Sequence, residues 1–101
     1  MKLLLVTVVE QYEKEVINLF KKAKIENFSG SDIDGYKNPV SLLMKSSWFP
    51  NVKGGVESSL LFSFTDDERI DILFGLIKEF NTHLETNNPI KAVVVPIERN
   101  I

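Results

Sequence analysis

Apolar and polar residues recur along this chain with two periods, and these periods predict helices and strands. Residues 2–9 form an almost wholly apolar, β-rich run, which is typical of a strand buried on both faces. Over residues 12–24, apolar side chains recur at helical spacing and charged side chains largely occupy the other side. The apolar set is Tyr12, Val16, Leu19, Phe20 and Ala23. The pattern predicts an amphipathic helix of roughly three turns.

The next two strands differ in polarity. Residues 28–35 (FSGSDIDG) are polar on both faces and contain Gly30, which favours a strand at a sheet edge. Residues 58–65 alternate, so that two sets of side chains lie on opposite faces. These sets are Leu60, Phe62 and Phe64 on one face, and Ser59, Leu61 and Ser63 on the other.

A second helix and a last strand complete the predicted elements. The run Thr65-Asp66-Asp67-Glu68 fits a capping box, in which the Thr65 hydroxyl and the Glu68 carboxylate satisfy free N–H groups at the helix start. Apolar residues then continue at helical spacing to Leu84. Residues 90–97 (IKAVVVPI) form a strand after a break at 87–89, and Pro96 favours an edge position or a strand end.

The order β-α-β-β-α-β is that of the ferredoxin-like split βαβ motif. We therefore predict an α+β fold with a four-stranded antiparallel sheet and two helices on one of its faces. Right-handed crossovers predict that the first and third strands lie in the centre, antiparallel to the second and fourth. At 101 residues, the chain is expected to form one domain over 1–101.

The connection over residues 36–56 (YKNPVSLLMKSSWFPNVKGGV) is long for a compact domain and has no clear period. Such connections are usually binding or lid loops, or are disordered. Three lysines lie in it without an acidic residue among them, beside several large apolar side chains. We predict a partner-docking loop that acts through Leu43, Met44, Trp48 and Phe49. Packing of Trp48 and Phe49 against their own subunit is the alternative.

The apolar strands also predict an assembly. Two helices on one face leave the other face bare, yet the strands at 2–9 and 92–95 are apolar on both faces. A monomer would expose a large hydrophobic patch, so we expect a closed homo-oligomer.

Composition narrows the function classes. A net charge of −2 gives no support for nucleic-acid binding. The absence of cysteine excludes disulfides, thiolate metal sites and cysteine nucleophiles, and His83 is the single histidine. No stretch is long enough to cross a membrane, and the short start MKLLLVTVVE indicates a buried strand rather than a secretion signal. The expected location is cytoplasmic.

Catalytic candidates are few. No Walker loop, no G-x-S-x-G and no nucleophile–base set occur, so we do not expect an enzyme. Asp32 and Asp34 share one face of their strand, which suits either a cation or a solvated sheet edge. His83 lies near a helix end, where a protonated imidazole favours the negative end of the helix dipole, with metal ligation as the alternative.

Taken over nearly its whole length, the chain resembles the P-II family of nitrogen-signalling proteins. The resemblance rests on the MK-plus-apolar first strand, the step Asp34-Gly35-Tyr36 into a long loop, Thr65-Asp66-Asp67 before the second helix, and Lys91 entering the last strand. At the family's glycine-rich B-loop, this chain has Asn87-Asn88-Pro89-Ile90-Lys91, so it resembles a divergent member.

The resemblance implies a non-enzymatic regulatory trimer. Adenine nucleotides would bind in clefts between subunits, and the loop at 36–56 would correspond to the T-loop that docks on a membrane transporter or another protein. The resemblance carries over Ser29, Gly35 and Lys91 to this cleft. Lys37, which stands where the family has a glycine, and Arg99, which could instead pair with an acidic residue, complete the candidates for its lining. The identity of the ligand stays open.

A second resemblance is to the CutA proteins, metal-tolerance trimers of the same architecture. It would imply metal binding through His83, Met44 or the acids of the second strand.

Overall fold

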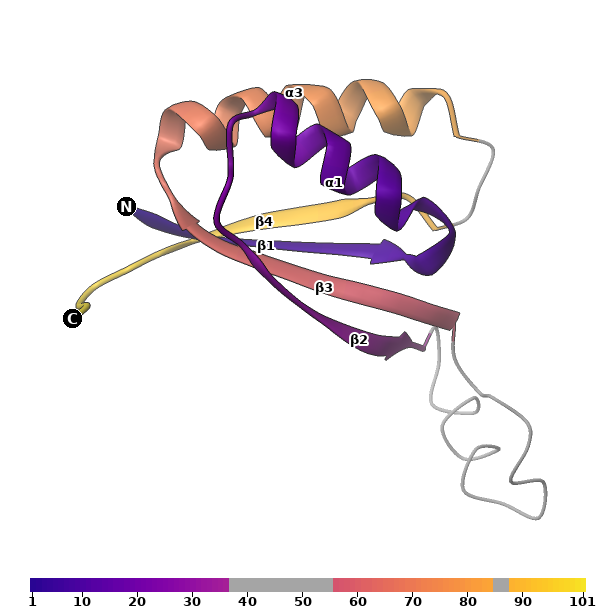
Figure 1. The fold of residues 1–101 in the computed structure, drawn as a ribbon, viewed down its shortest axis with the longest axis horizontal. Coiled ribbons are helices and arrows are strands. Elements are labelled where there is room, and N and C mark those ends of the chain that lie inside the picture. Colours follow the sequence, from indigo (N-terminus) through magenta and orange to yellow (C-terminus); the bar gives the residue numbers. More distant parts are fainter. Residues whose placement is uncertain (37–55, 85–87) are drawn as a thin grey trace, which may run out of the picture.

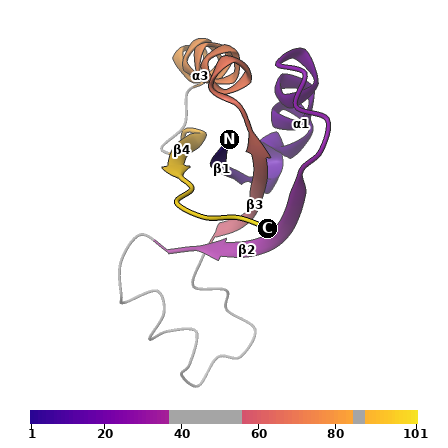
Figure 2. The same cartoon turned by 90° about the vertical axis from the view of Figure 1, so that its left-hand side faces the viewer.

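Four strands form one antiparallel sheet, and two helices cover one of its faces (Figures 1 and 2). The computed structural model describes residues 1–36, 56–84 and 88–101. The strands are β1 (Lys2–Val9), β2 (Ser29–Gly35), β3 (Val56–Thr65) and β4 (Lys91–Pro96). The helices are α1 (Glu13–Lys22), which follows the 3-10 turn η1 (Glu10–Tyr12), and α3 (Asp67–Thr82). This arrangement confirms the predicted α+β, ferredoxin-like class.

The strand order is β2-β3-β1-β4, which confirms that the first and third strands are central. Each central strand runs antiparallel to its edge neighbour, as predicted, but the prediction was wrong for the pairs β1 and β2, and β3 and β4, whose members run in the same direction. The crossover through α1 returns the chain so that β1 and β2 run the same way. The connection after β2 then reverses it, and β3 and β4 both run against β1.

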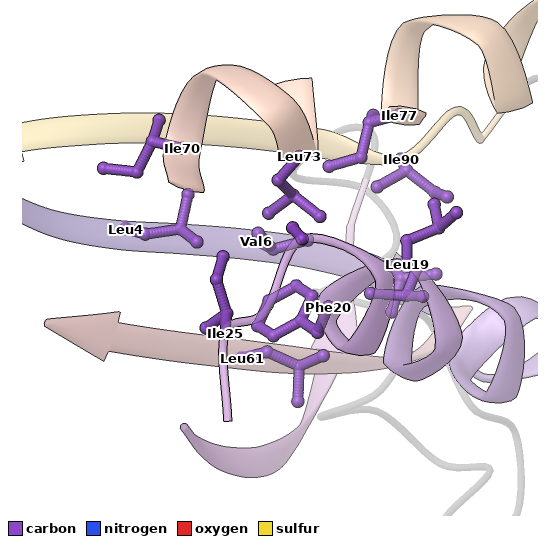
Figure 3. Close-up of a cluster of buried hydrophobic side chains, with 13 residues drawn as sticks. Leu4, Val6, Leu19, Phe20, Ile25, Leu61, Ile70, Leu73, Ile77 and Ile90 are labelled. Carbon is purple, nitrogen blue, oxygen red and sulfur yellow. The ribbon is translucent and has the colours of Figure 1, made fainter. Parts of the chain in front are cut away.

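The core lies between the sheet and the helices (Figure 3). Alternate residues of β1 point towards the helices, and Leu4 and Val6 are fully buried there. They meet the apolar stripes of α1 and α3, which the helical spacing had predicted. The buried apolar side chains are Leu4, Val6, Val8, Val16, Leu19, Phe20, Ala23, Ile25, Leu61, Ile70, Leu73, Ile77 and Ile90.

Two serines of β3 are buried on this helix-covered face, and each finds a partner. The Ser59 hydroxyl donates to Glu13 Oε2 on α1 at 3.0 Å, and the Ser63 hydroxyl donates to the main-chain oxygen of Asn27 at 2.6 Å. A buried hydroxyl without a partner would be costly, so these bonds explain how polar residues fit beneath the helices. They also fix α1 and the segment before β2 against β3.

The start of α3 differs from the predicted capping box. The N-cap is Asp66, not Thr65, and its carboxylate accepts the main-chain N–H of Arg69 at 2.9 Å. The guanidinium of Arg69 also pairs with Asp66, and Arg69 Nε donates to the main-chain oxygen of Lys24 at 3.1 Å. Aspartate is as good an N-cap as threonine, and Asp66 also forms an ion pair with Arg69. These two interactions explain why the N-cap is one residue later than predicted.

Lys24 ends α1 in a left-handed conformation, with φ of 61°. The N–H of Lys24 bonds Lys21 O at 3.0 Å, and the N–H of Ile25 bonds Phe20 O at 2.9 Å. This pair of bonds is a Schellman motif, which satisfies the last carbonyls of the helix. Arg69 therefore ties the end of α1 to the beginning of α3.

The second face of the sheet, here called the open face, carries no helix in the described part of the chain (Figure 2). Strand pairing places Phe62 and Val93 on either side of Leu5 on this face, and Phe64 and Val95 on either side of Leu3. Phe64 is 60% exposed and Val93 is 54% exposed. Among the described strand residues of the open face, Lys91 is the sole charged side chain.

Candidate functional site

A hollow of about 250 Å³ lies where the 36–56 connection leaves and rejoins the sheet. We call it the loop-foot pocket. Gly35 and Val56 are opposite each other in the β2–β3 ladder, so both ends of the connection meet at this point (Figure 1). The lining comes from the end of β1, the end of β2, the start of β3 and the segment entering β4, and includes Thr7, Ile33, Gly35, Tyr36, Val56 and Lys91.

The charge of the loop-foot pocket comes from Lys91. Within its described lining, this ammonium is the one group that is charged at pH 7, and the other side chains are apolar or neutral and polar. Thr7 faces Lys91 across the β1–β4 ladder on the open face. A lysine beside neutral polar groups suits a phosphate or carboxylate, to which it gives charge-assisted hydrogen bonds.

Gly35 keeps the pocket open by its lack of a side chain. It shares the open face with Ile33, two residues earlier on β2. A Cβ at this position would lie 3.4 Å from Ser58 Oγ, and a longer side chain would extend over the pocket. The Ser58 hydroxyl itself donates to Val56 O at 3.1 Å, within the first residues of β3 after the connection.

The structure brings together two of the five residues predicted to line the cleft. Gly35 and Lys91 both line the loop-foot pocket. Ser29 lies at the other end of β2, about 20 Å away at the usual rise of a strand, in a hollow of about 450 Å³ beside Phe62 and Phe64. Arg99 is exposed and follows β4, beyond the same end of the sheet as Ser29. Lys37 lies outside the described residues.

The residues predicted to dock a partner also lie outside the described part of the chain. These are Leu43, Met44, Trp48 and Phe49. The structure does define where their segment starts and ends, because the Gly35–Val56 pair closes the ladder at the pocket. Their docking role stays a prediction.

Several acidic side chains lie on the helix-covered side of the sheet, at the end where the loop-foot pocket lies. Glu10, Asp32, Asp34 and Glu57 surround a hollow of about 560 Å³. Asp32 and Asp34 share a face, as their spacing predicted. Within residues 1–36, 56–84 and 88–101, however, no three acidic, histidine or cysteine side chains are placed to hold a metal ion.

His83 is the C-cap residue of α3 and is exposed. Its main-chain N–H bonds the last turn of the helix at Phe80 O, at 3.1 Å. This position agrees with the predicted place near the helix end. Its side chain belongs to no metal-binding group among the described residues.

Two features of the site escaped the sequence reasoning. Thr7 lines the pocket, and the signal for it was its place as the one polar residue in the apolar run 3–9. Asn81, in the last turn of α3, hydrogen-bonds the main chain of Ile90 immediately before Lys91. Nothing in its neighbours along the sequence distinguishes Asn81 from a solvated helix residue.

No protein-family model matches this chain, and no curated protein matches it. In the part of the chain that the structure describes, no helix combines the length and apolarity needed to span a membrane.

Proposed function

We propose that this chain is a non-enzymatic regulatory protein, a divergent relative of the P-II family, whose 36–56 loop docks on a partner under the control of a small anionic ligand. The carrying observation is that Gly35, Tyr36 and Val56, at the two ends of the loop, line the same hollow as Lys91. An anion held by Lys91 therefore contacts the point from which the loop departs.

The ligand acts by favouring one state of the loop. An anion bound between Lys91 and the Gly35–Tyr36 segment contacts both of them in only one arrangement of the loop base. Binding therefore stabilises that arrangement. A ligand shifts an equilibrium by its difference in affinity for the two states, and order–disorder of a segment is a common form of such a switch. The partner class is a membrane transporter or another protein, reached through the loop.

A homo-oligomer, specifically a trimer, completes the proposal. Ser29 and Arg99 lie at the end of the sheet opposite Lys91, so one chain alone does not place all three on one small ligand. A neighbouring copy can bring its Ser29 end against the loop-foot pocket and form a cleft between subunits. Covering the open face would also remove Phe64 and Val93 from water.

An adenine nucleotide is the candidate ligand, with an altered phosphate grip. Pro89 has no N–H to offer, and Asn88 and Pro89, which line the pocket, belong to the stretch where the P-II resemblance would place a glycine-rich loop. Lys91 then carries the main phosphate contact by charge. Binding should consequently depend strongly on this one side chain.

The test is isothermal titration calorimetry with ATP, ADP, AMP and cyclic nucleotides. We expect heat with at least one of them, and a loss of affinity of about tenfold or more in Lys91→Ala, because a charge-assisted contact to phosphate is removed. Lys78→Ala is the matched control, since Lys78 is an exposed lysine on α3, away from the pocket.

The same samples are digested with trypsin, which cleaves after the lysines of the 36–56 loop. The ligand that gives heat should change the cleavage rate in wild type and not in Lys91→Ala. Absence of heat with every nucleotide removes the ligand from the proposal. Heat with an unchanged cleavage pattern removes the control of the loop.

The alternative of a CutA-like metal protein has no supporting observation among the described residues. His83 and the acids of β2 do not form a three-ligand group there, and Met44 lies outside the described part.

A further inference from the structure

The side chain of Asn81 pairs with Ile90 as a strand residue would. Its Nδ2 donates to Ile90 O at 2.9 Å, and its Oδ1 accepts the N–H of Ile90 at 3.0 Å. A carboxamide carries the same donor and acceptor as a peptide group, so the pair copies one rung of an antiparallel ladder. One side chain from the last turn of α3 thus satisfies both main-chain groups of Ile90.

Ile90 is also held by its own side chain. It is 3% exposed and belongs to the cluster beneath α3 that includes Ile77 and Leu19 (Figure 3). Its main chain and its side chain are therefore fixed by two independent sets of contacts. This leaves the residue little freedom to shift along or rotate about the chain.

The anchored residue lies between two residues of the loop-foot pocket, Pro89 and Lys91. Successive side chains of an extended segment point to opposite faces. With Ile90 directed into the core, Lys91 is directed to the open face, where it pairs with Thr7 of β1. The position of the ammonium at the pocket therefore depends on how Ile90 is held.

We infer that Asn81 is a positioning residue of the loop-foot pocket: it holds Ile90 so that Lys91 meets an anionic ligand at the base of the loop. The inference rests on the proposed function, because it requires a ligand in that pocket. Asn81 does not line the pocket and acts through the main chain of Ile90.

The decisive variant is Asn81→Asp, because the aspartate side chain has almost the same size and shape as that of asparagine. As a carboxylate it accepts from the Ile90 N–H but has no hydrogen to donate to Ile90 O, and the two oxygens repel. As a carboxylic acid it donates and accepts, and so replaces the carboxamide. An ordinary aspartate protonates near pH 4, at about 3.9, so lowering the pH restores the missing bond within the same molecule.

The experiment measures the Kd of ATP for wild type, Asn81→Asp and Asn18→Asp at pH 7 and near pH 4, with circular dichroism to confirm folding. Asn18 is exposed on α1, and its side chain makes no hydrogen bond to the described residues, so Asn18→Asp controls for the added charge. The quantity compared is the ratio of the variant Kd to the wild-type Kd at each pH, which cancels the effect of pH on ATP itself.

We expect Asn81→Asp to bind ATP about tenfold more weakly than wild type at pH 7, the loss typical of one disrupted hydrogen bond. Its ratio should approach one near pH 4, while the Asn18→Asp ratio stays near one throughout. A ratio of one at pH 7, or a loss that is equal at both pH values, overturns the positioning role and leaves the proposed function standing. If wild type binds neither ATP nor any of the other adenine nucleotides, the proposed ligand fails and this role fails with it.

Discussion

Asp66 and Arg69 show how two side chains connect separate helix ends. Asp66 accepts the main-chain N–H of Arg69, and the Arg69 guanidinium bonds both Asp66 and Lys24 O. The pKa of the Asp66 carboxyl is lowered from its ordinary value of 3.8, chiefly by the hydrogen bond from the Arg69 N–H. Partial desolvation opposes this change in pKa, and the positive charge of Arg69 adds to it.

This lowered pKa predicts a stability difference that depends on pH. The folded state favours ionised Asp66, so its contribution is present above the ordinary pKa of 3.8, which applies to the unfolded chain, and is lost as the pH falls through the lower folded pKa. We expect Asp66→Asn to be less stable than wild type at pH 7, with the gap closing in strong acid. Urea unfolding from pH 7 to pH 2 measures this.

Asp67→Asn provides the control, since Asp67 is an exposed acid in the same first turn of α3 and is not the N-cap. Its stability should follow the wild-type pH profile more closely than Asp66→Asn does. Identical pH profiles for wild type and Asp66→Asn would show that the Asp66 contacts do not stabilise the folded state.

At the scale of elements, two glycines have opposite roles. Gly30 in β2 lies so close to β3 that a Cβ would come within 2.7 Å of Leu61 Cδ2, and Leu61 is buried. Gly75 lies within α3, where a Cβ would meet no atom within 4 Å beyond the neighbouring backbone of its own helix. Close packing against Leu61 requires glycine at position 30. At position 75, no close contact requires glycine, and it only lowers the stability of the helix.

We therefore predict opposite signs for the same substitution. Gly30→Ala should destabilise the protein by about 1–3 kcal/mol, because Leu61 must move in a packed core. Gly75→Ala should stabilise it by about 1 kcal/mol, from helix propensity. Urea unfolding at one protein concentration compares them. A neutral or stabilising Gly30→Ala would show that Leu61 has room to rearrange.

The sequence located the elements well but left their faces undecided. The predicted strand at 2–9 matches β1, and the other element ends agree to within about two residues, the usual uncertainty of such boundaries. The alternation in β3 showed which residues share a face. The buried face is the one with Ser59 and Ser63, because Glu13 and Asn27 arrive from distant segments to bond them.

For the whole molecule, the open face is the feature that bears most on assembly. It carries Phe62 and Phe64, whose rings meet edge to face with centroids 6.5 Å apart, next to β1 and the valines of β4. Monomers rarely expose large contiguous apolar patches. We propose that other copies of the chain cover it.

Val93→Glu tests this assembly, because Val93 is 54% exposed on the open face. In the assembly, the Glu carboxylate would be buried between copies without a partner. Burial of an unpaired charge costs free energy, which disfavours association. We expect multi-angle light scattering to give an oligomer for wild type and a monomer for Val93→Glu. Ile72→Glu is the matched control, since Ile72 is 46% exposed on α3 and should leave the oligomer intact. A monomeric wild type at micromolar concentration would contradict the proposed assembly.

The candidate site was predictable in part. Gly35 and Lys91 were assigned by resemblance and lie together, while Ser29 and Arg99 are at the opposite end of the sheet. A resemblance gives positions along the chain, and the pairing register gives their separation in space. Asn81 could not have been found from its neighbours, since its partner lies nine residues away and is a main-chain group.

By itself, the sequence determined the order, type and approximate limits of the elements, because hydrophobic period and chain breakers act over a few residues. It also determined the α+β class, since the connection rules allow only a few topologies for this order of strands and helices. The tertiary structure decided the direction and register in which the strands pair. This pairing places Gly35, Val56 and Lys91 at one pocket. It also decided which face of β3 is covered and how Asn81 holds Ile90. These follow from register and long-range packing, which no local pattern encodes.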